Sequence, residues 1–479
     1  MSRVAEHIHT ALEEDLPSAW SLATIEDLVG ADGVFVDGDW VESKDQDPTG
    51  DVRLIQLADI GDGEYRNKSE RFLTHEKALE LGCTFLMRGD VLIARMPDPL
   101  GRACIFPGDP KKSVTVVDVA IVRSSNGAFN HRWLMYFINA PAFRTSVASL
   151  QSGSTRKRIS RGNLVRISLP VPPLGQQNRI VAEIEKQFSR LDEAVANLKR
   201  VKANLKRYKA SVLKAAVEGK LTEDWRKQHP NIEPANKLLE RILSERRAKW
   251  SGKRKYKAPA EPEMNNLFTL PDQWTWASPD QLSAGEPYAL AIGPFGSNLK
   301  VSDYTTSGVP LIFVRNIRSA NFEEREAVFV SKHKAEELRS HQVSGGDILI
   351  TKMGAPPGDA CLYPEARFRA VITADCIKLR LSPLLSDKHF FVHAINSQVV
   401  KPQILAITKG VAQMKVSLAR FSRIALPLPP LAEQCQIVAE VERRQSLIEE
   451  LEVAVEANLI RADRLRRSSL TAAFSGRLL

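Results

Sequence analysis

The segment LPVPPL at residues 169–174 decides the fold, because it returns as LPLPPL at residues 426–431. In both places Ile-Val-Ala-Glu follows, at residues 180–183 and 437–440, so the two copies lie 257 residues apart. The same offset pairs Gly89-Asp90 with Gly346-Asp347, and Gly219 with Gly476. Near the start the pairing slips to an offset of 254, between Trp20 and Trp274. Solenoid repeats run roughly 20–50 residues, so each copy here holds a whole domain and a helix. The chain can therefore fold as a pseudo-dimer.

Composition narrows the class of protein. The 479 residues suffice for two or three domains with cores of their own. A net charge of +10 fits an anionic partner such as nucleic acid, and it equally fits a basic protein without one. The five cysteines show no CxxC spacing, and Cys104 and its repeat equivalent Cys361 are predicted as small core residues. No signal peptide is apparent and no apolar run approaches the roughly 20 residues of a membrane span, so we expect a cytoplasmic protein with no role at a membrane.

The first portion of each copy, residues 16–170 and 270–427, mixes short β-rich runs with helical patches. Residues 91–94 and 348–351 follow the Gly-Asp turn and are predicted as buried strands. Residues 114–122 and 371–379 are predicted as another strand, and residues 133–139 and 390–396 as a short helix. Each copy is therefore expected to contain an α+β domain.

The second portion of each copy begins after the prolines, which end a strand and permit a helix beyond them. Apolar residues then recur every seven positions, which predicts a coiled-coil seam. The seam residues are Ile184, Leu191, Leu198, Leu205 and Val212, then Val441, Ile448, Val455 and Ala462. A neighbouring apolar stripe includes Val201, Tyr208, Leu451 and Leu465. About 40 residues would make a rod of roughly 60 Å, ended by Gly219 or Gly476.

Two features of the helical portions stay open. Gln187, Arg444 and Asn458 interrupt the seam, either because it tolerates them or because they fix which helix pairs with which. Between the copies, residues 222–268 have no counterpart and carry a short amphipathic helix followed by a cationic run at 246–257. That run is either a solvated connector or a contact to DNA phosphate or to a protein partner.

The duplicated order of a mixed domain, LPxPPLxxQxxIVxxIE and a long helix resembles the specificity subunit of type I restriction–modification enzymes. The resemblance covers nearly the whole chain and includes GDILI at residues 346–350 and GPFGSNLK at residues 293–300. It implies two similar target-recognition domains joined by two long antiparallel helices about a pseudo-two-fold axis. It assigns residues 1–170 and 269–427 to the recognition domains, 171–221 and 428–479 to conserved spacer helices, and 222–268 to a connector.

The family's role is also implied by the resemblance. Each recognition domain would read one half of a bipartite site in double-stranded DNA. The helices would set the spacing and dock two methyltransferase subunits, which restriction subunits would join. No cofactor is expected on this chain, since S-adenosylmethionine, ATP and Mg²⁺ belong to the partner subunits. Residues 34–39 read VFVDGD where the second copy has its PFGS loop, which puts equivalence of the two reading surfaces in doubt and predicts an asymmetric target.

Base edges are read by arginine at guanine and by asparagine or glutamine at adenine, whereas phosphate contacts supply much of the affinity. The best candidates are two equivalent loops ahead of the proline hinges, each following a glycine. The candidate residues are Thr155, Arg156, Lys157 and Arg158 in the first copy, and Gln413 and Lys415 in the second. Arg95 and Lys352, which end equivalent strands, are candidate phosphate contacts, with solvation of a strand end as the alternative. Ser297, Asn298 and Lys300 form a further candidate patch, which is otherwise a glycine-rich turn without a ligand.

No catalytic set is found. An S-adenosylmethionine glycine motif, HExxH and GxSxG are missing from the sequence. His389 and His393 are four apart, but their repeat equivalents are Arg132 and Tyr136, so no metal site is predicted.

The competing hypotheses are a coiled-coil scaffold that does not read DNA sequence and an unrecognised DNA-modifying enzyme.

Overall fold

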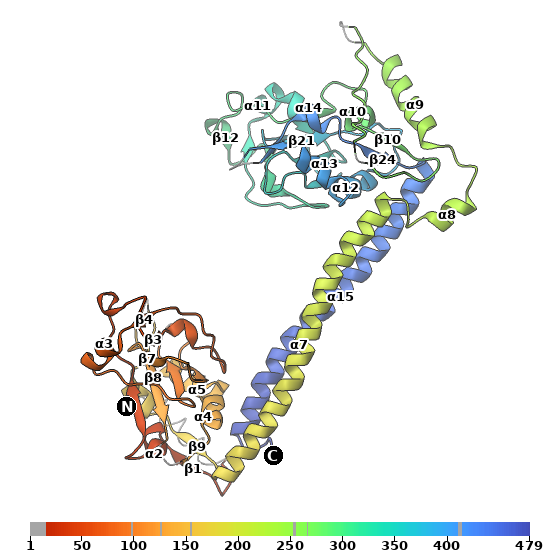
Figure 1. Cartoon of the computed structure of the whole chain (residues 1–479). Coiled ribbons are helices and arrows are strands. Elements are labelled where there is room, and N and C mark those ends of the chain that lie inside the picture. The colour runs from red at the N-terminus through yellow and green to blue at the C-terminus, as the bar shows by residue number, and fades with distance from the viewer. Residues whose placement is uncertain are drawn as a thin grey trace. The chain divides into compact units, whose positions relative to one another are not determined.

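A computed structural model describes residues 16–96, 99–124, 127–153, 156–251, 255–265, 267–410 and 414–479. It divides into two compact units. Unit 1 comprises Met1–Arg200 with Val455–Leu479, and unit 2 comprises Val201–Ala454. Each unit is an α+β domain that also holds part of both long helices, α7 (Leu174–Val217) and α15 (Leu431–Phe474) (Figure 1). The fold class predicted from the sequence is confirmed.

The core of unit 1 is an antiparallel sheet of order β2-β8-β5-β6, formed by Val34–Asp37, Val119–Arg123, Val91–Ala94 and Arg102–Ile105. Its side chains alternate between two apolar layers. Val91 and Ile93 face helices α4 (His131–Ile138) and α5 (Pro141–Ser149) and the ends of the long helices, whereas Leu92 and Ala94 face the region around Ile55. Burial on both faces explains why this strand is continuously hydrophobic.

Smaller elements complete unit 1. A second sheet has the order β4-β3-β7, formed by Phe72–Leu73, Val52–Ile55 and Lys112–Thr115. Strand β1 (Ser21–Ala23) pairs antiparallel with β9 (Leu169–Val171) directly before α7. The short helices are α2 (Ile25–Val29), α3 (His75–Glu80) and α6 (Arg161–Val165).

Unit 2 repeats this plan with additions. Its main sheet is β11-β21-β18-β19, from Leu290–Ile292, Cys376–Leu379, Ile348–Thr351 and Ala360–Leu362. The second sheet is β12-β16-β13-β20-β17, from Tyr304–Thr305, Phe329–Val330, Val309–Ile312, Ala370–Ile372 and Gln342–Val343. Two-stranded pairs are β10 (Thr275–Ala277) with β24 (Leu426–Leu428), β14 (Ile317–Arg318) with β15 (Asn321–Phe322), and β22 (Thr408–Lys409) with β23 (Lys415–Val416). The helices are α8 (Glu223–Gln228), α9 (Ala235–Ala248), α10 (Pro279–Leu282), α11 (Lys332–Glu337), α12 (Lys388–Asn396), α13 (Lys401–Ala406) and α14 (Leu418–Phe421).

The strand predicted at residues 114–122 is wrong as one element. Two strands, β7 and β8, join there at residues 116–118 and enter different sheets, and β20 and β21 do the same in unit 2. The turn is stabilised by Arg95, whose Nη2 donates to the carbonyl of Val117 at 2.6 Å. The strands predicted at 91–94 and 348–351 are confirmed, and α4 and α12 match the predicted short helices.

The same buried polar contacts recur in both units. Arg123 donates from Nε and Nη2 to the two oxygens of Asp90 at 2.7 and 2.6 Å, and Arg380 holds Asp347 at 2.7 Å twice. The carboxylates also accept from the backbone N–H groups of Met87 and Ser344, respectively. The repeated Gly-Asp dipeptide therefore makes a tight turn whose aspartate is neutralised by an arginine at the end of the neighbouring strand.

Each long helix presents one buried seam. Ile184, Leu205, Val212, Val441, Ile448 and Val455 are all at most 8% exposed, as the heptad pattern predicts, and Leu191 packs on the core of unit 1. The neighbouring stripe differs, because Val201, Tyr208, Leu451 and Leu465 are 42–52% exposed. Within unit 1, Asp192 pairs with Arg466 and Gln187 accepts from Ser469, so residue numbers rise on α7 as they fall on α15. The helices are antiparallel there.

The ends of the helices follow the sequence signals. α7 and α15 stop two residues before Gly219 and Gly476, whose φ angles are +70° and +74°. A Cβ on Gly219 would lie 2.6 Å from Cγ of Pro271, and one on Gly476 would lie 2.5 Å from Cγ of Pro17. Glycine is thus required both by the backbone conformation and by the chain that passes close by.

Candidate nucleic-acid interface

The two predicted reading loops are equivalent hairpins. Ser152 and Arg158 exchange backbone hydrogen bonds of 2.9 Å across the first one. In the second, Lys409 pairs with Lys415 between β22 and β23, and these positions are the repeat equivalents of 152 and 158. Arg156, Lys157, Arg158, Lys409 and Lys415 are exposed. Thr155 and Gln413 lie outside the described residues, so the structure gives no placement for them.

Each hairpin borders the turn between the two sheets of its own unit. In unit 1, Arg158 donates to Asp118 at 3.2 Å, and the N–H of Ile159 donates to the carbonyl of Arg95 at 3.0 Å. In unit 2, the N–H of Val416 donates to the carbonyl of Lys352 at 3.0 Å. We call the surface made by the hairpin, the turn and the loop after β2 or β11 the hairpin edge. In unit 1 it comprises residues 38–42, 116–118 and 152–158, without the undescribed 154–155. In unit 2 it comprises 293–300, 373–375 and 408–416, without 411–413.

Arg95 and Lys352 support this edge from within. Arg95 is only 5% exposed, donates to the carbonyls of Ile159 and Val117, and forms an ion pair with Asp37 at 3.1 Å. Its burial lowers the pKa of the guanidinium below the ordinary value. Lys352 is half-buried and donates to the carbonyl of Ala374 at 3.0 Å. These internal contacts engage the Arg95 guanidinium and use the Lys352 ammonium to support the turn, and the phosphate contacts suggested for both residues stay predictions.

The loops after β2 and β11 begin in the same way. A Cβ on Gly38 would lie 2.4 Å from the carbonyl oxygen of Val116, and one on Gly293 would lie 2.1 Å from that of Thr373. Because 116 and 373 are repeat equivalents, the two glycines are too, at an offset of 255. Each loop ends at the residue that caps a short 3-10 helix, Glu42 in unit 1 and Lys300 in unit 2. The loop therefore spans four positions after Gly38 but seven after Gly293, and this difference in length hides the match between the two glycines in the sequence.

The longer loop of unit 2 carries the third predicted patch. Ser297, Asn298 and Lys300 are all exposed. The N–H of Asn298 donates to the carbonyl of Phe295 at 2.8 Å, and that of Lys300 donates to Asp303 at 2.7 Å. The patch therefore stands on an ordered turn at the hairpin edge of unit 2, and the shorter loop of unit 1 offers no equivalent of its extra residues.

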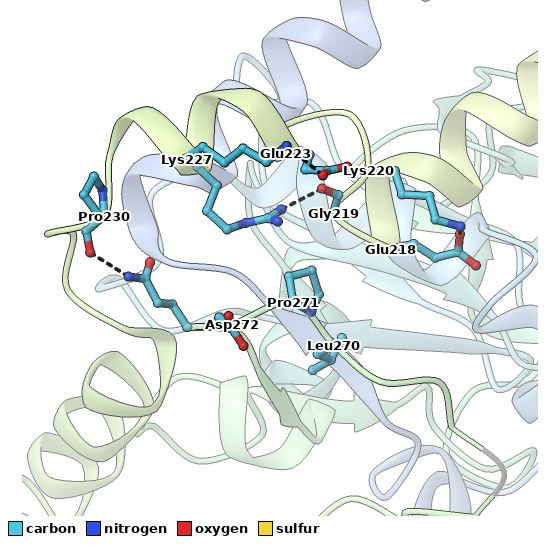
Figure 2. A pocket seen from close by; sticks show the side chains of 11 residues that line it. Glu218, Gly219, Lys220, Glu223, Lys227, Pro230, Leu270, Pro271 and Asp272 are labelled. Atoms are coloured by element: carbon cyan, nitrogen blue, oxygen red, sulfur yellow. Dashed lines mark hydrogen bonds and ion pairs between the residues drawn. The ribbon is translucent and has the colours of Figure 1, made fainter.

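A charged pocket lies at the connection between α7 and α8 in unit 2 (Figure 2). Behind it, the fully buried Glu433 accepts from Thr222 at 2.6 Å, from Arg226 at 2.8 and 3.0 Å, and from Trp274 Nε1 at 2.8 Å. Arg226 Nη2 also donates to the carbonyl of Gly219 at 2.6 Å. In unit 1 the equivalent carboxylate position holds the neutral Gln176, which accepts from Trp20 at 3.1 Å. Charged residues that line the pocket pair with one another, as Lys220 does with Glu218. We therefore interpret these residues as part of the junction between the helices.

Over the described ranges, no three His, Cys, Asp or Glu side chains gather in a way that could hold a metal ion. His389 pairs with Asp387 on the surface of α12, whereas His393 is buried in the core. Cys104 and Cys361 are fully buried, as predicted for core residues. Within the described part of the chain, no helix combines the length and apolarity that a bilayer crossing requires.

Comparison with known proteins accounts for this duplicated architecture. Residues 310–457 match the family model of the type I restriction modification DNA specificity domain. The chain is similar to the specificity subunits of type I restriction–modification enzymes. It is 24% identical over 360 residues to the EcoKI specificity subunit of Escherichia coli K12, covering 72% of this chain and 65%, less than two thirds, of that protein.

Two solved structures resemble nearly the whole chain. A chain from a study of complex assembly and conformational transition in a type I R-M system matches with a TM-score of 0.64 at 16% identity, covering 97% of this chain and 99% of that one. The HsdS subunit from Thermoanaerobacter tengcongensis matches with a TM-score of 0.50 at 18% identity, covering 97% and 98%. The fold shared with these two structures thus extends well beyond the segment matched by the family model.

Proposed function

We propose that this chain is the non-catalytic DNA-recognition subunit of a type I restriction–modification enzyme and that each hairpin edge reads one half of a bipartite, asymmetric target. The observation that carries the proposal is the pair of equivalent edges with unlike side chains. Arg156, Lys157 and Arg158 stand on one edge, and Lys409, Lys415 and the longer 293–300 loop stand on the other. Two edges of equivalent position that carry different side chains suit two half-sites of different base sequence.

The helices supply the proposed contacts to protein partners. Their exposed apolar stripe would be costly to leave in water over such an extent, and such patches mark interaction sites. Its members are Val201 and Tyr208 on α7 and Leu447, Leu451 and Leu465 on α15. We assign this stripe to two methyltransferase subunits, through which restriction subunits would join. S-adenosylmethionine, ATP and Mg²⁺ would then be bound by those partners, and the assembly would act in the cytoplasm.

Selection from a randomised duplex library by the full chain, with methyltransferase subunits present, tests the proposal. A two-part consensus supports it. Enrichment of no sequence would contradict it and favour a scaffold that does not read DNA. Methyl transfer or DNA cleavage by the chain alone would contradict the non-catalytic assignment.

Replacing Arg156 by alanine is expected to weaken binding by about 1–3 kcal/mol at one half-site and to relax base preference there, as loss of an arginine–guanine contact would. The readout is the Kd for the selected duplex and for single-base variants of it. Lys77→Ala, which removes a half-buried cation of α3 paired with Glu80, is the control outside the hairpin edge and should change little. If Arg156→Ala weakens all duplexes alike, Arg156 contacts phosphate and another residue reads that base.

A further inference from the structure

Both units expose an aromatic ring at the same point of the hairpin edge. Trp40 stands two residues after Gly38 and is 71% exposed, and Phe295 stands two residues after Gly293 and is 68% exposed. The glycines are structural equivalents, so the rings occupy the same step of the loop in a region where loop length and sequence otherwise differ. Isolated exposed apolar residues are common, but an aromatic at both copies of one surface loop calls for a shared role.

The backbone holds the start of each loop firmly. In unit 1, the N–H of Gly38 donates to Val119 at 2.7 Å, and that of Asp39 donates to Thr115 at 2.8 Å. Trp40 Nε1 also donates to Glu42 at 3.3 Å. In unit 2, the N–H of Gly293 donates to Cys376 at 3.2 Å, and the Phe295 carbonyl accepts from Asn298. A ring on a fixed mount loses little conformational entropy when it meets a partner.

Cations stand near the loops that carry the two rings. In unit 1, the exposed Arg161 donates to the carbonyl of Phe35 at 3.3 Å, on the strand that leads into the Trp40 loop. Arg158 forms an ion pair with Asp118 of the turn at 3.2 Å. In unit 2, the exposed Lys300 ends the Phe295 loop and the exposed Lys415 pairs with Met353 beside the same turn. Cations beside an outward aromatic ring match DNA, whose phosphates flank apolar base faces and thymine methyl groups.

We propose that Trp40 and Phe295 contact bases directly, one in each half-site, through their aromatic rings. This inference rests on the proposed function and adds the residues and the kind of contact. The partner group is an apolar base surface, either the methyl group of thymine in the groove or the face of a base at an opened step. Such a contact releases few counterions, because it neutralises no phosphate.

The test compares Trp40→Ala and Phe295→Ala with the full wild-type chain on the duplex that the wild type selects. Each variant should weaken binding about 5- to 150-fold, the range measured when a base–aromatic contact is removed. The slope of log Kd against log salt should stay as in the wild type. Trp40→Phe should retain most of the affinity. Leu79→Ala and Phe368→Ala remove exposed apolar side chains outside the hairpin edges and should bind as the wild type does.

Two substitutions in the duplex separate the two base surfaces. If uracil in place of one thymine reproduces the loss in wild type and causes none in Trp40→Ala, the ring contacts a methyl group. If the fluorescence of 2-aminopurine placed at one base step of the duplex rises on binding wild type but not Trp40→Ala, the ring opens that step. Binding by both alanine variants within twofold of wild type would overturn the inference. A wild type that selects no duplex would instead defeat the proposed function.

Discussion

Replacing Arg226 by alanine should destabilise the junction of α7, α8 and α15 in unit 2 by about 3–5 kcal/mol, the usual cost of stranding a buried charge. Glu433 is fully buried, and Arg226 donates to it from Nη2 and Nε at 2.8 and 3.0 Å. Without that cation, the carboxylate would retain only the hydroxyl of Thr222 and the indole of Trp274 as donors. Neither donor carries a positive charge, so desolvation of the carboxylate would be poorly offset.

The first copy suggests the rescue experiment. Its equivalent position holds Gln176, which pairs with Trp20 as Glu433 pairs with Trp274. The double variant Arg226→Ala/Glu433→Gln should therefore recover much of the stability lost by Arg226→Ala. Hydrogen exchange of backbone amides at the start of α15 measures the free energy of local opening. Lys227→Ala, which breaks only exposed pairs with Glu223 and Asp224, should cost less than about 1 kcal/mol. If Arg226→Ala lowers the free energy of local opening no more than Lys227→Ala does, the buried pair does not stabilise the junction.

The repeat let the sequence predict much of the fold but little of the geometry of the site. A constant offset pairs Asp90 with Asp347 and hairpin position 158 with 415, so equivalent elements could be found without any structure. The buried state of Arg95 could not be predicted, because it depends on Asp37 and on the Val117 carbonyl, which only folding brings close. The match between Gly38 and Gly293 was hidden by loops of different length. It becomes visible only through the carbonyl that each glycine packs against.

The heptad pattern had a similar limit. Seven-residue spacing identified Ile184, Leu205, Val441 and Ile448 as seam residues, and all four are buried. The same spacing also predicts a neighbouring apolar stripe, yet Leu451 on that stripe is 52% exposed. Two helices can bury one narrow stripe against each other, whereas a second stripe needs a further partner. Sequence alone therefore indicates how much apolar surface each helix has, and the structure shows which part stays exposed.

His393 should make unit 2 sensitive to acid. The side chain is 5% exposed in the core of unit 2, and its burial lowers its pKa to about 4, with a smaller contribution from His389. An unfolded chain binds this proton with an ordinary pKa of about 6.5. Between these values the unfolded state takes up more protons, so stability falls as pH falls. The contribution of neutral His393 is fully present above pH 6.5 and is lost toward pH 4, by about 3 kcal/mol in total.

Hydrogen exchange of α12 amides between pH 4 and 7, corrected for intrinsic exchange rates, measures this effect. His393→Gln, which carries no titrating proton, should flatten the loss of protection on the acid side, whatever its absolute stability at neutral pH. His389→Gln is the control of opposite sign. The hydrogen bond to Asp387 raises the pKa of His389, so its contribution is present at low pH and is lost as pH rises. If His393→Gln loses protection toward pH 4 as steeply as the wild type, another group drives the acid response and the buried imidazole does not protonate on opening.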